Sequence, residues 1–133
     1  MTTWQSDLIE LADDLEAFNA YALEQRWSDG LPLIPPTEAR VERMLAGSPR
    51  PHTTVIARLP VEDAECTVEK IAINAVMAGC RPDYMPLLIA TVSAVAQPAN
   101  WLRVLDTAER PQIDQGICHQ LHPIVSLLDA FKS

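Results

Sequence analysis

The longest apolar stretch of the chain covers residues 67–96, and its first half has the pattern of a buried helix. Three polar side chains interrupt this half before Gly79: Glu69, Lys70 and Asn74. A helix that is apolar on nearly all sides is typical of a protein interior. Thr67 is a suitable N-cap, and Gly79 suits the left-handed conformation that ends many helices.

The second half of this stretch predicts another helix. Asp83 is placed to cap it, Pro86 falls in its first turn, where a missing N–H is tolerated, and Pro98 stops it. Two helices joined by a short turn form an αα-hairpin. The pattern therefore predicts a central buried αα-hairpin over about residues 67–96, with Cys80 at its tip.

Helical spacing recurs on both sides of the hairpin. A first helix is predicted from Ser6, as cap, to about Arg26, and its apolar stripe is Leu8, Leu11, Leu15, Phe18 and Ala22. A short helix is predicted from Thr37 to Gly47. The tail over residues 117–131 places five apolar residues on one helical face: Leu121, Ile124, Val125, Leu128 and Phe131. Pro123 either kinks this helix or marks its start.

Only one segment has strand character. Residues 53–59 are rich in β-branched side chains and alternate in part, which predicts a short β element, and residues 60–66 are expected to form an acidic loop. The 133 residues suit one domain. We therefore expect a mainly α single domain over residues 1–133, in which N- and C-terminal helices pack the central hairpin.

The charge of the chain excludes several classes of partner. A net charge of −8 without a Lys/Arg cluster argues against binding nucleic acid or an anionic membrane surface. The N-terminus lacks the basic and then apolar pattern of a signal peptide. The apolar hairpin is interrupted well before the ~20 residues that cross a bilayer. Three cysteines without a pairing pattern fit a reducing compartment, so a cytoplasmic location is expected.

Cys80 is the sharpest candidate for chemistry. If a helix begins just after it, the positive end of the helix dipole and Arg81 would both favour the thiolate. The alternative is a small buried thiol that packs in a tight turn, since free cysteine is among the most buried residue types.

Lys70 and Asn74 are the next candidates. A buried Lys70 would have a lowered pKa and could act as a base, whereas the alternative is that Glu69 and Lys70 mark the solvent edge of the helix. Asn74 lies in the middle of the apolar run, so its amide is expected to find a partner in the core or across an interface.

A C-H-x-x-H cluster near the C-terminus is the candidate metal site: Cys118, His119 and His122. His119 and His122 share a face if this segment is helical, so both could bind one transition metal. The remaining ligands are not evident, and the alternative is that these side chains are incidental.

Two segments together resemble a known family. Residues 27–37, WSDGLPLIPPT, and residues 67–86, TVEKIAINAVMAGCRPDYMP, resemble the N-terminal part of the bacterial UGSC-type, selenoprotein-like family. The similarity covers roughly residues 26–96. Members of that family are a few hundred residues long and continue with a histidine-containing F-N-L-H-G-type segment, where this chain has residues 98–103, PANWLR. The family label implies thiol or selenol redox chemistry, but no cysteine–selenocysteine motif is present here.

The resemblance implies a truncated relative. We therefore expect a small subunit of a heteromeric enzyme, in which a longer related subunit supplies the missing half and a small-molecule substrate binds between them. Lys70, Asn74 and Cys80 would line the shared catalytic site. The alternatives are a self-sufficient thiol enzyme that uses Cys80, and a non-catalytic interaction or metal-carrying module that uses Cys118, His119 and His122.

Overall fold

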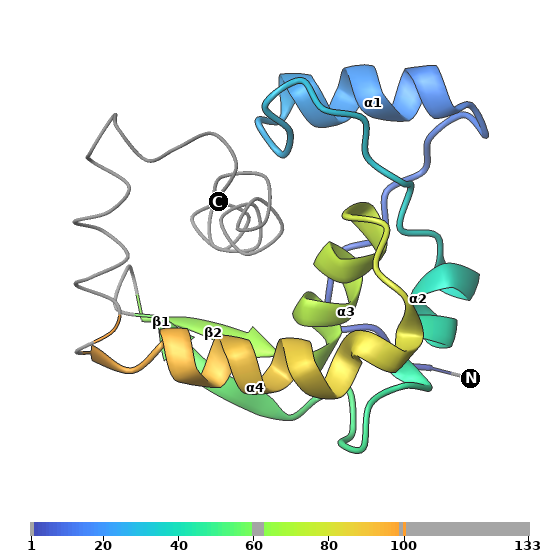
Figure 1. Cartoon of the computed structure of the whole chain (residues 1–133). Coiled ribbons are helices and arrows are strands. Elements are labelled where there is room, and N and C mark those ends of the chain that lie inside the picture. Colours follow the sequence, from blue (N-terminus) through green and yellow to red (C-terminus); the bar gives the residue numbers. More distant parts are fainter. Residues whose placement is uncertain (1, 60–62, 99, 101–133) are drawn as a thin grey trace.

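A computed structural model describes residues 2–59, 63–98 and 100 of the chain. Over these residues it contains four α-helices, one 3-10 helix and one antiparallel sheet of two strands (Figure 1). Their order is α1 (Leu15–Glu24), α2 (Glu38–Leu45), β1 (Val55–Leu59), β2 (Ala64–Thr67), α3 (Val68–Met77), η1 (Pro82–Tyr84) and α4 (Met85–Val95). The described part is thus mixed α/β with helix predominating. The helix predicted over residues 117–131 lies outside it.

Helix α3 is the centre of the core, as its sequence predicts. The hydroxyl of Thr67 accepts the Lys70 amide at 3.3 Å and so caps the helix. At the other end Gly79 has a φ of +75°, and the Cys80 amide reaches back to the Ala75 carbonyl at 2.9 Å. Four side chains of α3 are completely buried in the main hydrophobic cluster: Val68, Ile71, Ala72 and Ala75.

The start of α4 differs from the prediction. Asp83 does not cap it, because this residue lies within η1 and its carboxylate accepts two hydrogen bonds from Arg81, at 3.0 and 2.7 Å. Pro86 does fall in the first turn of α4. The hairpin is also more open than expected: α4 runs across α3 in Figure 1 and also contacts β1, while α2 packs against α3.

The strand predicted over residues 53–59 is confirmed as β1. Its partner β2 replaces part of the loop expected over residues 60–66, so that expectation was wrong for Ala64 onward. The reason is cross-strand pairing: Glu65 lies opposite Arg58 on the solvent side and forms an ion pair with it, while Cys66 turns into the core. Four residues are too few for such alternation to be recognised in the sequence.

The first helix starts later than predicted. Helix α1 begins at Leu15 with Asp14 as its N-cap, whose carboxylate accepts the Glu16 amide at 2.8 Å. Residues 7–13 are not helical, and Ser6 binds Glu69 instead of capping a helix. The buried face of α1 is confirmed at Phe18 and Ala22.

A proline-rich segment over residues 27–37 lies between α1 and α2 in the sequence and makes hydrogen bonds to both α1 and α3. The side-chain amide of Asn19 makes two hydrogen bonds with the backbone of Leu33. Its oxygen accepts the Leu33 N–H at 2.6 Å, and its nitrogen donates to the Leu33 carbonyl at 3.1 Å. The rings of Tyr21 and Trp27 pack edge to face with centroids 5.5 Å apart. These contacts fold the segment back along the helix.

Candidate functional site

The two segments that carry the family resemblance meet at the C-terminal end of α3. The Ile34 amide donates to the Met77 carbonyl at 3.0 Å, which fixes the extended segment against the helix end. A Cβ atom on Gly79 would lie 3.5 Å from Cδ1 of Ile34, an ordinary contact distance. We call the residues at this meeting point, Ile34, Gly79 and Cys80, the Cys80 junction.

Gly47 lies very close to the backbone of Pro82, beside this junction. A Cβ atom there would lie 1.9 Å from the Pro82 carbonyl oxygen and 2.6 Å from its carbon. The end of α2 and the start of η1 therefore come together only because residue 47 has no side chain. This contact fixes the turn that carries Cys80 relative to α2.

Cys80 is half-buried, and its chemistry differs from the expectation. Burial raises the pKa of its thiol above the ordinary value of 9.0. The expected stabilisation of a thiolate was wrong because Arg81 turns to Asp83, and η1 rather than a long helix follows Cys80. The junction therefore presents a neutral thiol.

Lys70 and Asn74 lie on α3, before the turn that carries Cys80. Lys70 is exposed and its Nζ donates to the Glu65 carbonyl at 2.9 Å, which confirms that it marks the solvent edge of the helix. Asn74 is half-buried, and its amide donates to the Lys70 carbonyl at 2.8 Å, one turn earlier in its own helix rather than in the core. With a rise of ~1.5 Å per residue, Lys70 and Cys80 are separated by roughly 10 Å or more along the helix. Lys70 and Asn74 lie within α3 and Cys80 lies in the turn after it, and no described hydrogen bond joins the side chains of the three.

Glu69 is a titratable residue whose position differs from the prediction. The alternative that placed Glu69 with Lys70 at the solvent edge is wrong for Glu69, because its side chain is completely buried. Its carboxylate accepts the Gln5 amide at 3.1 Å, the Ser6 amide at 2.9 Å and the Ser6 hydroxyl at 2.7 Å. The signal was its spacing, since residues three and seven positions later, Ala72 and Val76, are on the buried face.

Glu69 joins three segments that are distant in the sequence. Its backbone amide donates to the His52 carbonyl at 2.9 Å, and Nε2 of His52 lies 3.9 Å from the Glu69 carboxylate. The same imidazole nitrogen contacts the Thr3 carbonyl at 3.1 Å. Because the carboxylate oxygens are occupied by these donors, the arrangement anchors the N-terminal segment rather than offering a free general base.

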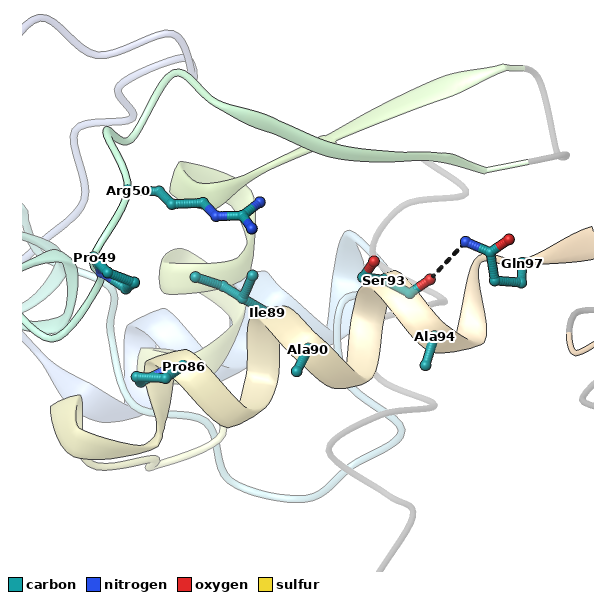
Figure 2. Close-up of a pocket in the computed structure, with 8 residues that line it drawn as sticks. All are labelled: Pro49, Arg50, Pro86, Ile89, Ala90, Ser93, Ala94 and Gln97. Atoms are coloured by element: carbon teal, nitrogen blue, oxygen red, sulfur yellow. Dashed lines mark hydrogen bonds between the residues drawn. The ribbon is translucent and has the colours of Figure 1, made fainter.

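A shallow groove lies between α4 and the loop that carries Pro49 and Arg50 (Figure 2). It has a volume of about 430 Å³ and is lined by Pro49, Arg50, Pro86, Ile89, Ala90, Ser93, Ala94 and Gln97. The Arg50 side chain extends over Ile89, and its guanidinium makes no hydrogen bond or ion pair with any described residue. An unpaired guanidinium above an apolar floor suits an anionic group on a small molecule. None of the candidates Cys80, Lys70 and Asn74 lines this groove.

The candidate metal ligands Cys118, His119 and His122 lie outside the described residues. Within residues 2–59, 63–98 and 100, no group of three His, Cys, Asp or Glu side chains is placed to hold a metal ion. Nor does this part of the chain contain a helix of the length and apolar character needed to cross a membrane. No protein-family model, curated protein or solved structure matches this chain.

Proposed function

We propose that this chain is a small subunit of a heteromeric bacterial enzyme and contributes one side of an active site to a longer related chain. The observation that carries the proposal is the position of Ile34. Its side chain contacts the Gly79 turn, yet 42% of the residue is exposed. A second chain that covers Ile34 would therefore lie beside the turn that carries Cys80.

Exposed apolar residues in the part of the chain that ends at Ile34 support this proposal. Ten large apolar residues of the described chain are exposed, and seven of them fall between residues 8 and 34: Leu8, Ile9, Leu11, Leu15, Leu23, Leu31 and Ile34. Exposed apolar residues that gather in one region favour contact with another chain. The resemblance of residues 26–96 to the N-terminal part of a longer family is in line with a longer related partner.

The chemistry of Cys80 favours a shared site over a thiol enzyme that acts alone. A thiol whose pKa is raised by burial needs a nearby base or cation to become a nucleophile. Arg81 is already paired with Asp83, so the partner would have to supply that group. In this proposal Cys80 faces a small-molecule substrate between the chains, and Lys70 and Asn74 contact substrate or partner farther along α3. A transition metal on Cys118, His119 and His122 remains a separate prediction.

Co-expression with a longer related chain from the same host tests the proposal. We expect the two chains to copurify as a heteromer with a defined native mass. Ile34→Asp is expected to weaken the complex at least about tenfold, since it places a charge in the interface. Leu87→Asp is the matched control, because Leu87 is an apolar residue of α4 that is 67% exposed and does not belong to the Cys80 junction. Two chains that remain separate under reducing conditions would refute the proposal.

A further inference from the structure

Residues 7–16, with the sequence DLIELADDLE, are exposed along their whole length. Both ends of this segment are fixed: Ser6 is bound to Glu69, and Asp14 caps α1. Along the segment large aliphatic side chains face solvent, with exposed fractions of 66% for Leu8, 41% for Leu11 and 57% for Leu15. With Ile9, four aliphatic residues are exposed over eight positions. Exposed aliphatic residues that are close together favour contact with another molecule.

The spacing of these residues is helical although the segment is not. Leu8, Leu11 and Leu15 recur at i, i+3 and i+7, the positions by which an amphipathic helix contacts a groove. Residues 7–13 adopt no regular structure, and none of their amides donates to another described residue. Two further helical turns without a covering surface would leave the same leucines in water, so the helix gains little by extending alone.

The charge of the segment selects the class of partner. Five of its ten residues are acidic and none is basic: Asp7, Glu10, Asp13, Asp14 and Glu16. A second copy of the chain would bring the same negative charge to the interface. The chain's own residues 101–133 carry three Lys or Arg residues against four acids, so their formal charge is not positive. A different chain, with an apolar groove flanked by Lys or Arg, is complementary to both the leucines and the acids.

We infer that residues 7–16 are a docking segment that folds into a basic, apolar-lined groove of a different protein chain, as an N-terminal extension of α1. This inference rests on the proposed function, because the longer related chain is the partner expected to provide the groove. Acidic residues in the first turns of the extended helix would also favour it through the helix dipole.

A synthetic amphipathic helix of leucine and lysine is the probe, and the same peptide with glutamate in place of lysine is its control. Binding is followed by fluorescence anisotropy, and helix formation by the backbone chemical shifts of residues 7–13. The lysine peptide is expected to bind more weakly as salt is raised and to induce helical shifts. Leu11→Ser should weaken binding about tenfold, whereas Leu87→Ser should leave it unchanged. Equal binding of the two peptides would overturn the inference.

A proline tests the folding step separately. Ala12 is exposed, its amide donates to no described residue, and proline there would block a helix through residues 7–16. Ala12→Pro should weaken peptide binding about tenfold or more, while Ala12→Ser should retain it. The same pair is then examined in the complex with the longer related chain. If Ala12→Pro forms the complex as well as the unchanged chain does, the inference is overturned but the proposed function stands. If neither the variants nor the unchanged chain form a complex, the proposed function itself is refuted.

Discussion

The hydroxyl of Ser6 donates to the buried carboxylate of Glu69 at 2.7 Å, across 63 positions of sequence. The Ser6 amide reaches the same oxygen at 2.9 Å. This contact fixes the N-terminal segment on α3, and it also explains why α1 does not begin at Ser6. Ser6, which the local sequence predicts to be a helix cap, instead donates two hydrogen bonds to a carboxylate in the core.

Removing the Glu69 carboxylate should release the N-terminal segment. Glu69→Ala leaves the Gln5 and Ser6 donors without their acceptor, so we expect a loss of ~1–3 kcal/mol in the free energy of unfolding. Glu69→Gln keeps one acceptor oxygen and should cost less. Urea denaturation measures the stability, and limited proteolysis reports release of residues 2–6.

Glu65→Ala is the matched control for this prediction. Its carboxylate is exposed and, among the residues that the structure describes, forms an ion pair with Arg58 alone, so the change in unfolding free energy should stay below ~1 kcal/mol. If Glu69→Ala and Glu65→Ala behaved alike, Glu69 would not be an anchor.

The contact between Gly47 and Pro82 predicts that alanine is not tolerated at residue 47. The added Cβ would lie 1.9 Å from a backbone oxygen, so α2 and η1 must move apart. We expect Gly47→Ala to lower the free energy of unfolding by ~1–3 kcal/mol. Ala46→Ser, at the exposed neighbouring position, should change it by less than ~0.5 kcal/mol. An unaltered melting temperature for Gly47→Ala would contradict the close approach.

The two described cysteines should differ in reactivity. Cys66 is completely buried, whereas Cys80 is half-buried in a turn. In a Cys118→Ser background, a thiol reagent should modify Cys80 first, at a rate that still rises above pH 9 because the pKa of Cys80 is raised. Mass spectrometry of the labelled chain assigns the site. Preferential labelling of Cys66 in the folded protein would show that the core is arranged differently.

Burial of Cys66 should make the fold sensitive to high pH. Burial raises the pKa of its thiol from 9.0 to about 12, against a smaller opposing effect of Lys70. Below pH 9 the thiol is protonated in both states, so its contribution to stability is constant. Between pH 9 and 12 only the unfolded chain loses the proton, and the free energy of unfolding falls by ~1.4 kcal/mol per pH unit.

Comparison with Cys66→Ala isolates this effect from the lysines and tyrosines that titrate in the same range. The difference in unfolding free energy between the two proteins should narrow as pH rises from 9 toward 12. A constant difference would mean that Cys66 ionises equally in the folded and unfolded chains.

Features that depend on neighbouring residues can be predicted from the sequence. Thr67 caps α3 and Gly79 ends it, because both roles require only a side chain or a φ value beside the helix. Cys80 falls at the turn between two helices for the same reason. The buried character of α3 followed from its apolar periodicity, and the strand at Val55–Leu59 from its β-branched residues.

The long-range partner of each polar group is visible only in the folded chain. The Ser6 hydroxyl can either accept a backbone amide as a helix cap or donate to Glu69, and Asp83 lies within reach of Arg81 before it can cap α4. Glu69 is buried because the N-terminal segment and His52 bring polar groups to it, a condition that spacing along α3 suggests but cannot supply. Local periodicity specifies a face and a turn, whereas the choice among competing hydrogen-bond partners depends on segments that meet only when the chain is folded.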